Sequence, residues 1–255
     1  MRHKIKGKYL KLIKPCKENK LSNTIESIEK KIMKSLISFL LIISMLFWGI
    51  IPTILLALFN INPETLSNTT KYIITFINDL LYLILLTSIY YKTIKKDLYK
   101  YFNNNFKNNF KTSLSYWGVG LLIMYISNII IAIVTNGQIA QNEEAVRSLI
   151  NIAPLYMAFQ VGIYAPLTEE LIFRKSIRDI IDNKYIYALI SGLIFGGLHA
   201  ITSINNLISL LYLIPYCSLG IAFGLLYAKS NNIFSTIIIH SIHNLLAFTL
   251  YMVAL

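Results

Sequence analysis

The chain has 255 residues, a mean hydropathy of +0.57 and only 14% charged residues. A soluble domain of this length carries nearer one quarter charged residues and lacks repeated apolar runs of about twenty residues. The composition therefore excludes a soluble protein. The net charge of +12 is better explained by basic loops on the cytoplasmic side of a membrane than by nucleic-acid binding.

Apolar stretches separated by polar connections predict an all-α, polytopic transmembrane helical bundle of about seven to eight spans. Pro52 falls inside the first stretch and is expected to kink it, because proline lacks a backbone N–H. The fourth stretch is too long for one straight span, so the count depends on how it divides. The expected spans, in chain order, cover residues 35–59, 72–91, 113–135, 148–182, 185–201, 207–229 and 233–255.

Basic residues are divided unevenly between the two sides of this arrangement. Residues 1–34 hold eleven Lys or Arg against three Glu, which predicts a basic cytoplasmic tail with an amphipathic helix near residues 21–33. Residues 92–111 hold six lysines and are expected to form a polar loop. With the amino terminus inside, 22 of the 24 Lys and Arg residues lie on the inner side. The sequence thus predicts a multi-pass protein of the cell membrane with a cytoplasmic amino terminus.

The chain divides into three predicted regions: the basic tail 1–34, the N-terminal transmembrane helices 35–147, and a transmembrane core 148–255 that carries the candidate chemistry. Two small-xxx-small pairs in the core are expected to let the fifth and sixth spans pack closely. These pairs are Gly192 with Gly196, and Gly220 with Gly224.

The core contains two adjacent carboxylates, Glu169 and Glu170, after a long apolar stretch. Ionisable groups within membrane spans cost roughly 3 kcal/mol each even on lenient insertion scales, so they indicate function. Pro166 predicts a break or kink at the residue before it, with Thr168 as the N-cap of the helix that follows. Arg174 lies four residues after Glu170, which is the favourable spacing for an ion pair. Glu169 is then the carboxylate left free to act as a general base.

Glu169 and His199 are expected to meet across a helical hairpin that turns at Asn183. They lie fourteen residues before and sixteen residues after the turn. At about 1.5 Å per residue, both are then roughly 20 to 25 Å from the turn and therefore level with each other. Phe195 precedes His199 by one helical turn and is expected to form a wall of the site.

His240 and Asn244 share a face of the last span, where they offer two hydrogen-bond donors to a developing oxyanion. His243 is the substitute candidate for His240. Two hydrolytic chemistries fit these groups. In one, Glu169 and His199 activate a water molecule; in the other, Glu169, His199 and His240 bind Zn²⁺, whose water attacks. The chain has no His-Glu-x-x-His helix, so no metal or other cofactor is favoured and zinc is the alternative.

Three short motifs therefore fall in order on successive spans: Glu169-Glu170-x-x-x-Arg174, Phe195-x-x-x-His199 and His240-x-x-x-Asn244. Together, over about residues 148–255, they resemble the CAAX protease and bacteriocin-processing (CPBP, also called Abi) family of intramembrane endopeptidases. The resemblance implies that Glu169 and His199 activate water. It also implies that His240 and Asn244 stabilise the oxyanion, and that Glu170 and Arg174 support the site.

The predicted function is an intramembrane endopeptidase that hydrolyses peptide bonds of a membrane-associated peptide or protein. The abundance of Lys, Ile and Asn fits an AT-rich coding genome, which we take as a hint of a bacterial source. Bacterial relatives in this family are tied to peptide maturation and bacteriocin immunity. The expected partners are the lipid bilayer and this substrate, and no nucleic acid is expected. The alternative is a non-catalytic immunity or interaction protein that keeps these polar groups for structure.

Overall fold

The computed structural model describes the backbone of residues 2–255 and the side chains of residues 24–255. Most side chains of the predicted basic tail, 1–34, therefore lie outside the described residues. The helices are α1 (Arg2–Phe47), α2 (Ile51–Leu58), α3 (Asn68–Ile89), α4 (Tyr91–Asn103), α5 (Phe106–Val134), α6 (Gln141–Ile152), α7 (Pro154–Phe159), α8 (Ala165–Glu169), α9 (Ile177–Ile180), α10 (Lys184–Ala200), α11 (Leu213–Ser230) and α12 (Phe234–Ala254).

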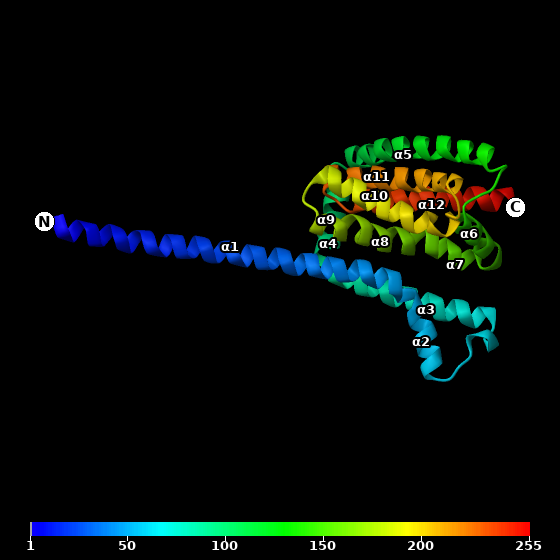
Figure 1. Cartoon of the computed structure of the whole chain (residues 1–255), viewed down its shortest axis with the longest axis horizontal. Coiled ribbons are helices and arrows are strands. Elements are labelled where there is room, and N and C mark those ends of the chain that lie inside the picture. The colour runs from blue at the N-terminus through cyan, green and yellow to red at the C-terminus, as the bar shows by residue number, and fades with distance from the viewer. Residues whose placement is uncertain (1) are drawn as a thin grey trace.

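The helices lie mostly side by side in one bundle, from which the N-terminal part of α1 extends (Figure 1). Two π-helical segments, Gln160–Tyr164 and Glu170–Ser176, join α7, α8 and α9 without a break. Residues 154–180 are therefore helical throughout, and we call them the interrupted helix. Its buried apolar side packs with α1, α3 and α10 through a core that includes Tyr82, Leu86, Leu171, Phe173 and Tyr187.

Six helical segments within the described residues are long and apolar enough to cross a membrane: Thr24–Leu58, Asn68–Ile89, Phe106–Val134, Lys184–Ser203, Ile208–Ser230 and Phe234–Ala254. The prediction of an all-helical, multi-pass membrane protein is confirmed. The predicted count of seven to eight spans is not confirmed. The interrupted helix is not among the six segments, and it contains a buried ion pair, Glu170 with Arg174.

The expected bend is present at the start of α2, where Pro52 lies (Figure 1), but the helix break expected at Pro166 is absent. A 3₁₀ turn, Trp48–Ile50, separates α1 from α2, whereas the interrupted helix continues through Pro166. The π-helical segment before that proline explains the continuity, because the N–H of Ala165 reaches back five residues to the carbonyl of Gln160. Thr168 is accordingly no N-cap, and its hydroxyl donates to the carbonyl of Tyr164 at 2.7 Å.

The predicted polar loop 92–111 is wrong as well, because the segment is largely helical in α4 and the start of α5. The polar composition conceals an amphipathic helix, whose buried face includes Asp97 and Tyr101. The two helices meet at Asn105, which has a positive φ of 59° and accepts a hydrogen bond from the N–H of Asn108 at 3.3 Å. Lysine spacing alone did not reveal this buried face.

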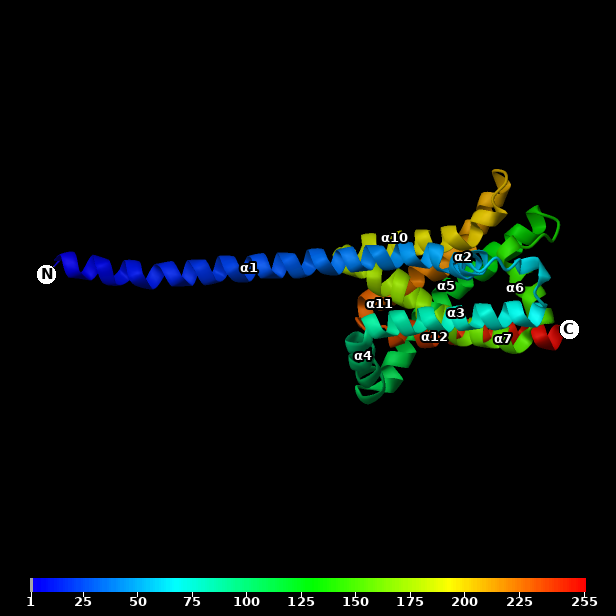
Figure 2. The ribbon, with the colours of Figure 1, turned by 90° about the horizontal axis from the view of Figure 1, so that it is seen from below.

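Basic segments that the charge pattern assigns to the inner side gather at one end of the bundle. Lys34 of α1 lies 2.6 Å from the Asp179 carboxylate, next to the turn before α10. Asn232, just after Lys229, donates to the backbone oxygen of Asp97 in α4 at 2.8 Å. Figure 2 shows α4 at the end of the bundle from which α1 extends. The grouping expected from the charge pattern is therefore present in the fold.

Helices α10 and α11 approach so closely that the glycines of the two small-xxx-small pairs have no room for a side chain. A Cβ at Gly192 would lie 2.5 Å from the backbone nitrogen of Ile221, and one at Gly220 would lie 2.9 Å from the Cα of Gly192. A Cβ at Gly224 would lie 2.9 Å from the Cα of Ala188. The predicted close packing is confirmed. These contacts fix the position of α10 along the axis of α11.

Alanine at Gly196 is expected to destabilise the protein by about 1 to 3 kcal/mol, because its Cβ would lie 2.7 Å from the backbone nitrogen of Cys217. The neighbouring Gly197 is the matched control, since no atom lies within 4 Å of its added Cβ. Gly197→Ala is expected to be neutral or stabilising by up to about 1 kcal/mol. Unfolding titrations in detergent measure both variants, and equal effects at the two positions would contradict the packing argument.

Candidate active site

The interrupted helix carries both glutamates, and the two π-helical segments lie on either side of Glu169. The first segment ends at Tyr164, and the second begins at Glu170. Single π turns inside α-helices occur frequently at functional sites, because they redirect side chains that a regular helix would place elsewhere. No spacing rule in the sequence indicated them.

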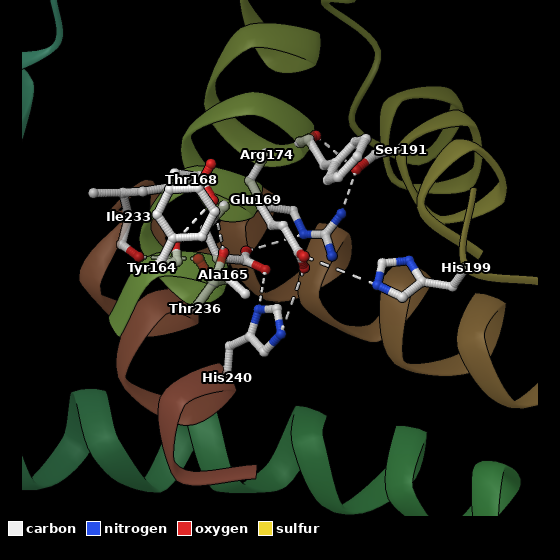
Figure 3. A network of polar contacts seen from close by, with 12 residues as sticks. Tyr164, Ala165, Thr168, Glu169, Arg174, Ser191, His199, Ile233, Thr236 and His240 are labelled. Carbon is white, nitrogen blue, oxygen red and sulfur yellow. Dashed lines mark hydrogen bonds and ion pairs between the residues drawn. The ribbon is translucent and has the colours of Figure 1, made fainter. Parts of the chain in front are cut away.

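Glu170 and Arg174 form a completely buried ion pair, with both side chains 0% exposed and Arg174 Nε 3.1 Å from Glu170 Oε2. Arg174 Nη1 also donates to the hydroxyl of Ser191 at 2.7 Å. Ser191 in turn donates to the backbone oxygen of Phe173 at 2.7 Å, so α10 is fastened to the interrupted helix (Figure 3). The pair is thus present as the i,i+4 spacing predicted.

Glu170 has a second partner, which sequence reasoning did not identify. Its Oε1 atom lies 2.9 Å from Nδ1 of His240, a buried residue of α12. An ionised carboxylate only accepts hydrogen bonds, so Nδ1 carries the hydrogen and donates it. This bond fixes the direction of the imidazole ring and turns Nε2 towards the other glutamate.

Glu169 lies between two imidazoles (Figure 3). Its Oε1 atom is 3.9 Å from Nε2 of His199, and its Oε2 atom is 3.8 Å from Nε2 of His240. The Glu169 side chain is 13% exposed to solvent, whereas the Glu170 side chain is completely buried, with 0% exposed. The meeting of Glu169 with His199 predicted from the hairpin is present, and Glu169 is the accessible carboxylate of the two.

His199 is oriented by its own helix and by aromatic rings. Its Nδ1 lies 2.8 Å from the backbone oxygen of Phe195, which can only accept, so Nδ1 carries a hydrogen and Nε2 faces the site. The rings of Phe195 and Tyr216 lie 4.3 and 5.3 Å from the imidazole, centre to centre. Phe195 is therefore a wall of the site, as its spacing from His199 predicted.

The two other candidates on α12 make no described hydrogen bond to this cluster. Nδ1 of His243 accepts a hydrogen bond from Trp117 Nε1 of α5 at 3.2 Å, so His243 is directed away from Glu169. Asn244 is half-buried one turn after His240, and among the described contacts it makes no hydrogen bond to the cluster. The structure thus joins His240, rather than His243, to the two glutamates.

Comparison with known proteins agrees with this geometry. Residues 151–246 match the family described as "Type II CAAX prenyl endopeptidase Rce1-like". The resemblance predicted from the motifs is confirmed. The CAAX-type segment, as we call residues 151–246, contains all seven motif residues: Glu169, Glu170, Arg174, Phe195, His199, His240 and Asn244.

Two curated relatives match part of the chain. The chain is 37% identical over 91 residues to "UPF0177 protein YxdF" of Lactococcus lactis subsp. lactis (strain IL1403), covering 36% of this chain and 48% of that protein. It is 33% identical over 111 residues to "Putative membrane peptidase YdiL" of Bacillus subtilis (strain 168), covering 42% of each. The matches thus span about half or less of the length of these relatives. No solved structure matches the chain.

The sequence analysis missed residues of the CAAX-type segment that contact the cluster, among them Ser191, Tyr216 and Phe223. Ser191 could have been predicted from the sequence, because it precedes Phe195 by four residues on the same helix face as His199. The Phe223 ring lies 5.4 Å from that of His240, and Tyr216 packs on His199. Aromatic residues are too common in membrane helices for spacing alone to single out these two.

The zinc alternative fits the orientation of the ligands but not their separation. Both imidazoles donate from Nδ1 and leave Nε2 towards Glu169, as metal-binding histidines typically do. However, zinc bonds of about 2.0 to 2.1 Å in a tetrahedral site place ligand atoms about 3.3 Å apart. The Glu169 oxygens lie 3.8 and 3.9 Å from the two Nε2 atoms. No group of three His, Cys, Asp or Glu in the described part of the chain has metal-site spacing.

Proposed function

We propose that the chain is an intramembrane endopeptidase that hydrolyses peptide bonds of a membrane-associated peptide or protein. The observation that carries this proposal is the accessible Glu169 carboxylate between two oriented imidazoles inside a helical bundle. The match of the CAAX-type segment and the name of the Bacillus relative support the same activity.

In this mechanism, Glu169 and His199 hold the attacking water between them. The Glu169 carboxylate accepts a proton from the water as its oxygen attacks the carbonyl carbon of the peptide bond. His199 Nε2 accepts a hydrogen bond from the second O–H of the water, which stays on the oxygen, and this bond fixes the direction of attack. The proton taken by Glu169 then passes to the amide nitrogen, the C–N bond breaks, and an amine and a carboxylic acid are released.

His240 and Asn244 are the proposed donors to the oxyanion of the tetrahedral intermediate. Two carboxylates and one guanidinium leave the cluster with one excess negative charge, and a protonated His240 makes it neutral. A neutral cluster avoids the cost of a net charge within the membrane. In this form His240 donates from Nδ1 to Glu170 and keeps the Nε2 hydrogen for the oxyanion.

The proposed biological role is peptide maturation or bacteriocin immunity in a bacterium. The similarity to proteins of Lactococcus and Bacillus supports a bacterial setting. The proposed location is the cell membrane with the amino terminus in the cytoplasm. The basic segments gathered at one end of the bundle support that orientation, since basic loops favour the inner side.

A proteolysis assay on the purified full chain in lipid nanodiscs tests the activity and its metal dependence together. A library of membrane-associated peptides is incubated with the protein, products are identified by mass spectrometry, and zinc is measured in the same sample. We expect cleavage that is unaffected by chelators, with zinc well below one atom per chain. Stoichiometric zinc that is lost together with activity on chelation would favour the zinc alternative instead.

A further inference from the structure

A second polar cluster inside the helical bundle surrounds Asp79 of α3, which the proposed mechanism does not use. Asp79 is only 7% exposed. Its Oδ2 atom accepts a hydrogen bond from the Tyr156 hydroxyl at 2.8 Å, and the Gln160 amide donates to the same oxygen. Gln160 Nε2 also donates to the Tyr156 hydroxyl at 2.7 Å. One carboxylate thus holds two consecutive turns of the interrupted helix.

Aromatic rings on both sides of this cluster keep α3 against the interrupted helix. Phe76 and Phe159 meet edge to face with ring centres 5.0 Å apart, and Tyr72 lies 6.1 Å from Tyr156. These contacts restrict the distance between the helices. The hydrogen bonds to Asp79 then determine how the interrupted helix is rotated about its own axis.

The residues bound by Asp79 lie just before the first π-helical segment and at its start: Tyr156 belongs to α7, and Gln160 belongs to the segment. Gln160 is its first residue, and the N–H of Ala165 closes it on the Gln160 carbonyl. A π turn contains one residue more than an α turn, so regularising it would rotate all later residues by about 100°. Glu169 follows this segment by only five residues. Its direction towards His199 and His240 therefore depends on the π turn.

The same segment also contacts α12, which carries His240. Gly162 lies in the middle of the segment, and a Cβ there would lie 2.9 Å from Cδ2 of Leu245. Leu245 is five residues beyond His240 on α12. The π turn is thus seated between α3 on one side and α12 on the other, and its geometry relates the carboxylate of Glu169 to the imidazole of His240.

We infer that Asp79 is a positioning residue: by binding Tyr156 and Gln160 it maintains the π turn at Gln160–Tyr164 and so aims Glu169 at the two imidazoles. This inference rests on the proposed peptidase function for its kinetic consequence. It does not rest on that function for its structural consequence, which is the hydrogen bonding of the segment itself.

Kinetics and hydrogen exchange of the full chain in nanodiscs test the inference. Asp79→Ala removes the acceptor and is expected to lower kcat by about 10- to 100-fold with KM changed less than about threefold, because misplacing a catalytic group by about 1 Å has effects of this size. Backbone exchange is expected to accelerate within residues 160–165 and to stay unchanged in α10 and α11. Asp79→Asn, which keeps an acceptor oxygen, is expected to restore most of kcat.

Asn78→Ala is the matched control, since Asn78 is the neighbouring residue of α3 and is equally buried at 7% exposure. It should leave kcat and the exchange of residues 160–165 unchanged. Tyr156→Phe removes one donor to Asp79 while keeping the ring, and it is expected to change kcat and exchange in the same direction but less. It replaces Asp79→Ala if that variant does not fold. Unchanged kcat and exchange in Asp79→Ala, or in Tyr156→Phe where it replaces that variant, overturn the inference. Absence of peptidase activity in the unmodified chain counts against the proposed function, and the exchange measurement still decides the role of Asp79.

Discussion

Replacing Glu169 with glutamine is expected to lower kcat for peptide hydrolysis by about 10² to 10⁴-fold, because an amide cannot accept the proton of the attacking water. The substitution preserves side-chain volume and can still hydrogen-bond to the imidazoles, so KM and the folded structure should change little. Steady-state hydrolysis of a peptide found in the library assay measures both constants. Thermal unfolding in the same nanodiscs verifies that the variant is folded.

The control for Glu169 is Glu143, an acidic residue outside the site. Glu143 lies on α6, is about half exposed, and pairs with Arg147 at 2.8 Å. Glu143→Gln should retain full activity. If folded Glu169→Gln protein retains the cellular function of the unmodified chain, the carboxylate is not a catalyst. The polar cluster then serves a non-catalytic immunity or interaction protein.

The meeting of Glu169 and His199 was predictable because it depends only on counting residues from a turn. Both helices rise by the same amount per residue, so the number of residues from Asn183 fixes the height of each side chain. The glycine pairs of α10 and α11 were predictable for a similar reason, since close helix packing requires small residues at this spacing. These predictions use only local periodicity and the order of the elements.

The bond between Glu170 and His240 was not predictable in this way, because the two residues are seventy positions apart on helices with no common turn. The π segments also lay beyond prediction. The first segment, Gln160–Tyr164, contacts α3 through Gln160 and α12 through Gly162, and such contacts are a property of tertiary packing rather than of local sequence. The rotation of Glu169 towards His240 depends on both features.

The amphipathic helix α4 shows a third limit of sequence reasoning. Its lysines match a polar loop in composition, but Asp97 is buried and accepts the N–H of Ile233 at 3.1 Å beside the start of α12. An acid beside a helix N-terminus satisfies a free backbone donor and complements the helix dipole. That role is visible only when the two segments, more than 130 residues apart, are placed together.

Replacing Arg174 with methionine is expected to destabilise the folded protein by about 3 to 5 kcal/mol, because Glu170 then remains buried without the guanidinium. Both side chains are completely buried, so water cannot solvate the remaining carboxylate. An unfolding titration in mixed detergent micelles measures the change in the free energy of unfolding. The exposed pair Glu143 and Arg147 has the same i,i+4 spacing and is the control. Arg147→Met should cost only about 0 to 1 kcal/mol.

Removing both charges separates the stabilising role of the pair from its role in the site. The double variant Glu170→Gln with Arg174→Met is expected to recover most of the lost stability, since replacing a buried ion pair by uncharged side chains is often neutral. Its activity should remain low, because an uncharged amide at position 170 is a weaker acceptor for the Nδ1 hydrogen that orients His240. Full activity in the double variant would show that neither the charge of Glu170 nor its bond to His240 is needed for catalysis. Continued instability would instead indicate that the amide finds no partner in the site.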